Sequence, residues 1–150
     1  MDKVDREILR ALQDDGSLSA AALAAKVGAS SASCWRRVRS LEAAGILGRT
    51  VRLVDARKVQ RGVNVMCQVR LKSHAPENRR GIEQLLESHD EIMECYTMSG
   101  EWDYLLRIVV ADIEEYERFL MRHVLNHVSV ATVASNFALS QLKYSTALPV

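Results

Sequence analysis

The chain is 150 residues long and carries 20 Lys and Arg against 19 Asp and Glu, for a formal net charge of +1. With 48% hydrophobic and 26% charged residues, it is not an intrinsically disordered chain, a collagen or a coiled-coil fibre. The near-zero total charge also argues against a strongly basic nucleic-acid binder. Three cysteines without a CxxC pair fit a reducing compartment. The charged start and the absence of a long apolar run predict a cytoplasmic protein without a membrane segment.

The charge is distributed unevenly along the chain. Residues 1–61 carry 12 Lys and Arg against 7 Asp and Glu, a charge of +5, whereas residues 62–150 carry 8 against 12, a charge of −4. Within the first part, residues 26–61 hold 9 basic side chains, opposed only by Glu42 and Asp55. Such a run favours a surface that faces a polyanion, although most basic runs are solvated faces. We expect two domains, 1–61 and 62–150.

Three short helices are predicted in the first domain. Each has a capping residue before it and a glycine after it, and the pairs are Asp2 with Gly16, Ser19 with Gly28, and Ser30 with Gly45. Apolar residues recur at helical spacing between these limits. The last two helices, over 20–27 and about 31–44, are joined by a tight glycine turn, which indicates a helix-turn-helix.

The third helix has one packed and one polar face. At 100° per residue, Val38 lies at the centre of the inner face with Cys34 and Leu41 beside it. The opposite face carries arginines and small hydroxyl residues with almost no carboxylate, which suits a recognition helix that approaches DNA bases and phosphates. Trp35 lies at the flank, where a rim position is favoured over a DNA contact.

A strand is expected over residues 46–54, because Val51 and Leu53 alternate with Thr50 and Arg52. Its arginines could reach phosphates beside the groove. With the third helix it completes the predicted DNA-binding set, which is Ser31, Ser33, Trp35, Arg36, Arg37, Arg39, Ser40, Arg49 and Arg52.

The second domain has the order βαββαβ, the ferredoxin-like arrangement. Strands are expected at 63–73, 92–98, 104–110 and about 129–139, with helices over 77–89 and after the cap Asp112. Glu115 stands at the position of a capping box. The later strands are largely apolar on both faces, and two helices can cover only one of them. We therefore expect the other face to pack on a second copy in a homodimer.

The residues resemble the leucine-responsive regulatory protein/AsnC family of transcription regulators over essentially the whole length. The matching segments are 5–9 with 12–13 and 15–16, then 37–42 with 45–46, and Ser99-Gly100-Glu101-Trp102-Asp103-Tyr104-Leu105-Leu106. Residues 31–33 depart from the family, which often has prolines there. The tail, residues 135–150, is similar to the subgroup that includes cysteine-responsive regulators.

The resemblance implies an α+β protein: a winged helix-turn-helix followed by a ferredoxin-like ligand-sensing domain. It also implies partners: double-stranded DNA at the nucleoid, a small amino-acid effector, and further copies that form dimers and octamers. The effector would bind between dimers. The residues implied for this site are Met98, Ser99, Gly100, Glu101, Trp102, Asp103, Tyr104, Ala134, Ser135 and Asn136. Asp103 could pair with the ammonium and turn N–H groups with the carboxylate, although a simple turn role is the alternative.

No enzyme motif, catalytic residue or cofactor site is identified. His123 and His127 have metal-ligand spacing, but no third ligand is apparent, so no metal is expected. Two hypotheses remain. The first is a sequence-specific DNA-binding transcriptional regulator that responds to a small amino acid. The alternative is an amino-acid binding module or metabolic enzyme whose N-terminal part serves assembly.

Overall fold

A computed structural model describes residues 1–150, which form two compact units. The first comprises residues 1–53 together with 142–150, and the second comprises residues 54–141. Residues 54–61 therefore group with the second unit, and the tail, residues 142–150, groups with the first. The functional boundary between residues 61 and 62 stays a prediction. No helix is long and apolar enough to cross a membrane.

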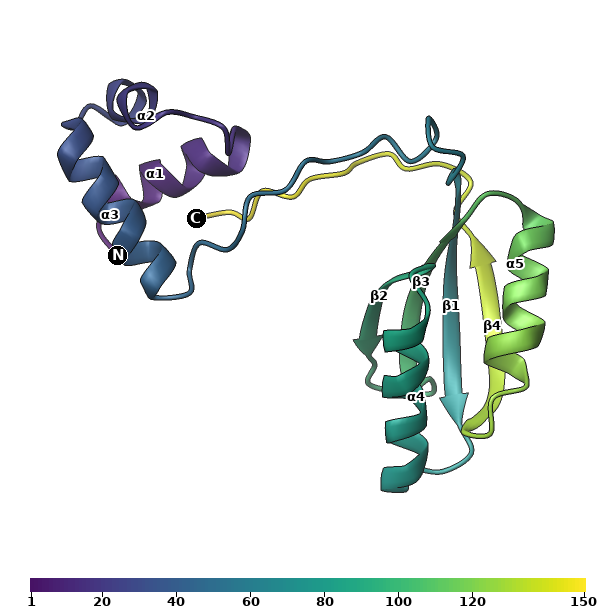
Figure 1. The fold of residues 1–150 in the computed structure, drawn as a ribbon. Coiled ribbons are helices and arrows are strands. Elements are labelled where there is room, and N and C mark those ends of the chain that lie inside the picture. Colours follow the sequence, from purple (N-terminus) through teal and green to yellow (C-terminus); the bar gives the residue numbers. More distant parts are fainter. The chain divides into compact units, whose positions relative to one another are not determined.

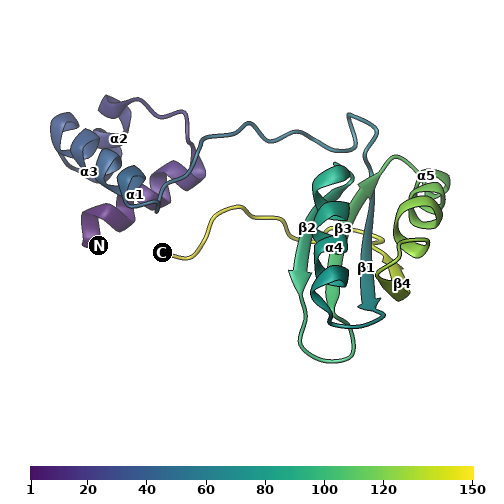
Figure 2. The same cartoon turned by 60° about the horizontal axis from the view of Figure 1, so that its bottom comes forward.

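The first unit contains three helices (Figure 2): α1 (Lys3–Asp14), α2 (Ala20–Val27) and α3 (Ser31–Ala43). Their predicted caps are present, because the side chains of Asp2, Ser19 and Ser30 each accept a backbone hydrogen bond three residues later. Gly28 has a φ of +65° and ends α2 in the left-handed conformation, which glycine adopts without strain. The sequence signals therefore locate these helices well.

The core of the first unit draws on all three helices. Ile8 and Leu9 of α1, Leu23 of α2, and Cys34 and Leu41 of α3 are all buried in one hydrophobic cluster. Cys34 is fully inaccessible and free, as expected for a small core residue. This packing fixes which face of α3 remains exposed.

The strand predicted over residues 46–54 does not form. That segment has no regular structure, and Val51 and Leu53 are 57% and 64% exposed. Alternation alone does not make a strand, because a strand needs a hydrogen-bonded neighbour and this segment has none in the chain. The following segment makes a turn in which Lys58 N–H donates to the Asp55 carbonyl.

The second unit is a four-stranded antiparallel sheet covered by two helices (Figure 1). Its elements are β1 (Val63–Leu71), α4 (Pro76–Ser88), β2 (Ile92–Thr97), β3 (Tyr104–Val110), α5 (Ile113–Phe119), the π-helix η1 (Leu120–Leu125) and β4 (Val130–Phe137). The strand order β2-β3-β1-β4 is that of the ferredoxin-like fold. The predicted α+β class and element order are confirmed.

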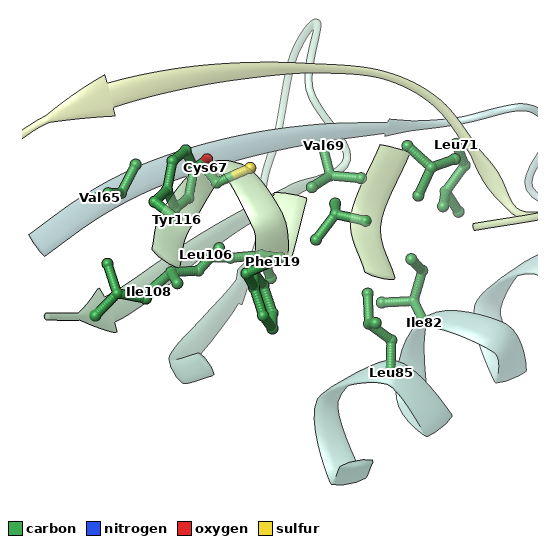
Figure 3. Close-up of a cluster of buried hydrophobic side chains, with 13 residues drawn as sticks. Val65, Cys67, Val69, Leu71, Ile82, Leu85, Leu106, Ile108, Tyr116 and Phe119 are labelled. Atoms are coloured by element: carbon green, nitrogen blue, oxygen red, sulfur yellow. The ribbon is translucent and has the colours of Figure 1, made fainter. Parts of the chain in front are cut away.

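Both helices pack against the same face of the sheet. Every second residue of β1, from Val65 to Leu71, is buried together with Ile82 and Leu85 of α4 and Phe119 of α5 (Figure 3). The opposite face has no covering element in the chain. Along β1 it alternates with the buried set and is only half-exposed.

Two local details differ from the sequence analysis. A register shift between Arg70 and Leu71 turns Val130 of β4 into the helix-covered core, although simple alternation from Val133 and Ser135, which face that core, would put Val130 on the other face. The predicted capping box at α5 is also altered. Asp112 accepts from Glu115 N–H at 2.7 Å as expected, but the Glu115 carboxylate accepts from Ala111 N–H instead of the cap.

Candidate functional site

The exposed face of α3 carries the predicted DNA-contacting residues. Ser31, Arg36, Arg39 and Ser40 are exposed, Ser33 is half-exposed, and Arg49 and Arg52 follow on the exposed segment after α3. The structure therefore gathers Ser33, Arg36 and Ser40 on one helix surface, whereas Ser31 lies at the start of the helix, about 140° around from Arg36. No ion pair involves Arg36, Arg49 or Arg52, so these three guanidinium groups are available to phosphates or base edges.

Arg37 is the exception among the α3 arginines. Its Nη1 lies 2.7 Å from Asp2 Oδ2 and 2.7 Å from Asp5 Oδ1, while its Nε is buried without a partner. Asp2 and Asp5 also form the capping box of α1. Arg37 therefore ties α3 to the start of α1, and its charge is already balanced inside the unit.

This clamp changes the titration of its carboxylates. The pKa of Asp5 is lowered first by the hydrogen bond from Asp2 N–H and then by Arg37, and the pKa of Asp2 is lowered by Asp5 N–H and then by Arg37. The pKa of Arg37 is raised by the same two carboxylates. The three groups thus stay ionised together over a wide pH range.

Trp35 is a rim residue, as favoured from the sequence. It is 52% exposed, and the Arg39 guanidinium lies over its ring at 4.5 Å from the centroid. Arg39 also lies 3.8 Å from Glu42. Both contacts are at the surface, where solvent screening makes them weak, so Arg39 can leave them for a stronger anion.

The turn between β2 and β3 is built around Asp103. Asp103 Oδ2 accepts from Leu71 N–H at 2.7 Å, and Asp103 N–H donates to the Val69 carbonyl at 3.0 Å. The Asp103 carbonyl in turn accepts from Met98 N–H at 2.9 Å. Gly100 has a φ of +113°, a backbone conformation that favours glycine at this position of the turn. Asp103 therefore joins the turn to the end of β1.

Two residues beside this turn were missed by sequence reasoning. Arg70 of β1 pairs with the Glu101 carboxylate, donates from Nε to the Glu101 carbonyl at 3.1 Å, and stacks over Trp102 at 5.1 Å. His74 Nδ1 lies 3.6 Å from Asp103 Oδ1. Strand alternation put Arg70 on the uncovered face, but only the pairing of β1 with β3 brings it to the turn.

The predicted effector residues of β4 do not join the turn within one chain. Ala134, Ser135 and Asn136 pair with Gln68, Cys67 and Met66 of β1. The turn leads into β3 on the other side of β1, and there Asp103 bonds to the backbone of Val69 and Leu71. The Ser135 hydroxyl lies 2.5 Å from Tyr116 Oη on the helix-covered side. The ten predicted residues therefore form two separate groups.

The Tyr116 side chain lies in the helix-covered core of the second unit, together with Cys67 (Figure 3). Burial raises the pKa of Tyr116 far above its ordinary value, which the hydrogen bond with Ser135 opposes. Burial likewise raises the pKa of the Cys67 thiol. These groups are neutral structural residues at ordinary pH, and Ser135 is held among them.

The histidines singled out from the sequence lie apart from both groups. His123 lies within the π-helix η1, where its ring centroid is 4.3 Å from that of His89, and His127 Nδ1 accepts from Ser129 N–H at 3.2 Å. No group of three or more His, Cys, Asp or Glu side chains is arranged to hold a metal ion.

Comparison with known proteins decides the family. Residues 64–148 match the Lrp/AsnC ligand binding domain, and residues 1–47 match a winged helix-turn-helix DNA-binding domain. The chain belongs to the Lrp/AsnC family. It is a helix-turn-helix transcriptional regulator, and the match over residues 1–47 favours DNA binding over the alternative that this part serves assembly. The family consists of transcriptional regulators and not of enzymes.

The similarity to curated members of the family extends over the full length of the chain. The chain is 36% identical over 150 residues to the DNA-binding transcriptional activator DecR of Escherichia coli, covering 100% of this chain and 99% of that protein. It is also 36% identical over 150 residues to the glutamate uptake regulatory protein of Zymomonas mobilis, covering 100% and 91%.

Solved structures in the family have the same fold. A transcriptional regulator from Neisseria meningitidis in complex with L-Met superposes with a TM-score of 0.96 at 31% identity, covering 99% of this chain and 96% of that one. An AsnC family regulator from Agrobacterium tumefaciens gives a TM-score of 0.93 at 43% identity, covering 99% and 97%.

Proposed function

We propose that the chain binds duplex DNA through the exposed face of α3 and regulates transcription in response to a small amino acid. The observation that carries the DNA part is the state of Arg36. It is exposed at the middle of α3 and has no ion-pair partner, whereas the neighbouring Arg37 is neutralised by two carboxylates. An unpaired arginine on such a face is suited to a phosphate or a guanine edge.

The predicted contact set is accordingly divided by role. Arg36, Arg49 and Arg52 supply free positive charge, and the serines of α3 permit close approach to the groove. Arg39 contacts the Trp35 ring at the edge of this face and can leave that weak contact to bind a phosphate. Arg37 holds the helix in place. DNA as partner also places the protein at the nucleoid in the cytoplasm.

The experiment measures DNA binding as a function of salt. Binding of a duplex selected from a random library by the wild-type protein is measured at salt concentrations between about 50 and 200 mM. The slope of the logarithm of the binding constant against the logarithm of the salt concentration then reports the number of phosphate contacts. Arg36→Ala should weaken binding and lower the slope by about 1 if Arg36 contacts a phosphate. If Arg36 reads a base, the variant should relax preference for the selected site by about 1–3 kcal/mol.

Arg6→Ala is the matched control, because Arg6 is an exposed arginine on α1, outside the proposed interface. It removes the same charge from the same unit. Equal effects of the two variants on affinity, slope and site preference would sink the assignment of α3 as the DNA-contacting helix.

We place the amino-acid effector at the turn of residues 98–104. Asp103 Oδ1 faces only His74 at 3.6 Å, so it can pair with a ligand ammonium, and the turn N–H groups can meet a carboxylate. The L-Met complex of the Neisseria meningitidis regulator supports an amino acid as the ligand class. A sulfur-containing amino acid such as cysteine is included in this class.

The separation of the turn from Ala134–Asn136 supports a site shared between copies. Since one chain does not bring the two groups together, a neighbouring copy can supply the second group to the turn of the first. The uncovered sheet face supports a homodimer as the unit of this assembly. It carries Met66, Leu105 and Val109, but also a polar network in which Arg107 bonds to Glu94 at 2.8 Å and to Asn64 at 3.0 Å.

This network makes the uncovered face more polar than the aliphatic surface expected from sequence. A dimer on it would combine apolar contact with paired polar groups, as many interfaces do. We propose dimers that assemble further, to octamers, through effector-sensitive contacts. Light scattering with and without each free amino acid tests this, and a monomer under all conditions would overturn it.

A further inference from the structure

The tail, residues 142–150, is bound to the first unit. Gln13 of α1 makes a reciprocal pair with one tail residue: Leu148 N–H donates to Gln13 Oε1 at 2.6 Å, and Gln13 Nε2 donates to the Leu148 carbonyl at 3.1 Å. One turn earlier on α1, Arg10 Nε donates to the Val150 carbonyl at 2.7 Å. Three hydrogen bonds thus join segments more than 130 residues apart in the sequence.

These contacts recognise the backbone of an extended peptide. A glutamine side chain offers the same donor and acceptor as a neighbouring strand, so it can pair with the N–H and carbonyl of one residue at once. Leu148 points outward with 72% of its surface exposed, so its side chain contributes little. The proline that follows it favours an extended backbone at Leu148 and brings no N–H group that needs a partner.

The end of the tail also contacts the hydrophobic core of the unit. Val150 is half-buried against the cluster that contains Ile8 and Leu9 of α1 and Cys34 and Leu41 of α3. Ser145 shapes the approach, because its hydroxyl accepts from Ala147 N–H at 3.1 Å. The tail therefore touches the same core that orients α3.

We infer that the face of α1 formed by Arg10 and Gln13 is a docking surface for the chain's own tail, and that the docked tail braces the DNA-binding unit. The bracing part rests on the proposed function. Because the tail continues from β4, docking gives the sensor a second, non-covalent attachment to the helix-turn-helix besides the covalent segment after α3. A change at β4 can then alter the support of α3 through tail occupancy.

The first experiment requires neither DNA nor effector. Hydrogen exchange of the tail amides is measured in the full chain for wild type, Gln13→Ala and Leu148→Pro. Gln13→Ala removes both partners of Leu148, and Leu148→Pro removes its N–H without touching α1. Each should speed tail exchange by about 10-fold, the effect of losing a hydrogen bond of ordinary strength. Arg6→Ala, a change elsewhere on α1, should leave tail exchange unchanged.

The second experiment measures affinity for the selected DNA duplex. Gln13→Ala and Leu148→Pro should each weaken binding several-fold, and the double variant should be no weaker than either single one, because both remove the same contact. Wild-type tail amides that exchange as fast as those of Gln13→Ala would overturn the docking surface. Protected tail amides with unchanged DNA affinity in both variants would overturn the bracing role alone. A wild-type chain that fails to bind DNA would instead contradict the proposed function, while the exchange result stands.

Discussion

Arg37 Nη1 of α3 lies 2.7 Å from Asp5 Oδ1 of α1, and the same nitrogen lies 2.7 Å from Asp2 Oδ2. Both carboxylates are already committed to the start of α1 through its capping box. One guanidinium therefore holds the middle of α3 against the start of α1. The basic run of residues 26–61 thus contains one arginine that serves the fold.

Arg37→Ala should lower the melting temperature of the protein without lowering the salt slope of DNA binding. The reason is that its charge is compensated by two carboxylates, so no phosphate counterion is released through it. Fluorescence anisotropy with the selected duplex at several salt concentrations gives the slope. Arg36→Ala provides the comparison, since its slope should fall by about 1. A drop of the same size for Arg37→Ala would make Arg37 a DNA contact.

The same clamp predicts an acid-dependent stability. The pKa values of Asp2 and Asp5 are lower in the folded chain than their ordinary value, which is about 4 when unfolded. Lowered carboxyl pKa values stabilise the fold above that value, and this contribution is lost as pH falls through the folded pKa. Urea unfolding between pH 6 and pH 2 should therefore show a smaller acid loss for Arg37→Ala than for wild type. Parallel curves for the two proteins would contradict the linkage.

Gly81 of α4 should not tolerate a methyl group. A Cβ there would lie 2.5 Å from Ser129 Oγ and 2.8 Å from His127 Cε1, and Ser129 is buried. Overpacking of this kind costs about 1–3 kcal/mol, which exceeds the gain of about 1 kcal/mol from replacing a helical glycine with alanine. Gly81→Ala should lower the free energy of unfolding in urea. Gly48→Ala, where a Cβ meets nothing within 4 Å, should leave it nearly unchanged.

Asp103→Asn should separate the two roles of Asp103. Asparagine keeps an oxygen that can accept from Leu71 N–H, but it removes the charge proposed for the ligand ammonium. We expect Asp103→Asn to fold and to lose the thermal shift given by the effective amino acid in a screen of the twenty free amino acids. Asp103→Ala should in addition lose about 1.5–3 kcal/mol of stability. An undiminished ligand shift in Asp103→Asn would leave Asp103 as a turn residue only.

The helices could be predicted from signals within a few residues of their ends, whereas contacts between residues far apart in the sequence could not. Caps and glycine stops placed α1, α2 and α3, because the groups that satisfy a helix end lie within a few residues. The role of Arg37 depends on Asp2 and Asp5 more than 30 residues away. Helical periodicity gives the face of a residue but not the partner that it meets.

The sheet shows the same limit at the candidate effector site. Alternation located β3 from Tyr104 to Val110 as predicted, but the strand order β2-β3-β1-β4 leaves β1 between the turn and Ala134–Asn136 of β4. Register is fixed by long-range pairing and by the bulge near Leu71. The strand expected over residues 46–54 is absent for a related reason. A strand forms beside a hydrogen-bonded neighbouring strand, and the alternation within one segment does not show whether such a neighbour exists.

The position of β1 between β3 and β4 has a consequence for synthesis of the chain. β1 is made first among the strands, yet its two neighbours arrive only when residues 104–110 and 130–137 have emerged. Pairings between such distant segments form slowly, whereas the three helices make mostly local contacts. The helical unit can therefore fold on the ribosome before β3 and β4 are available to pair with β1, the inner strand of the sheet. The tail emerges after β4. The helical unit, although it folds first, therefore gains its contacts with residues 142–150 only when synthesis of the chain is nearly finished.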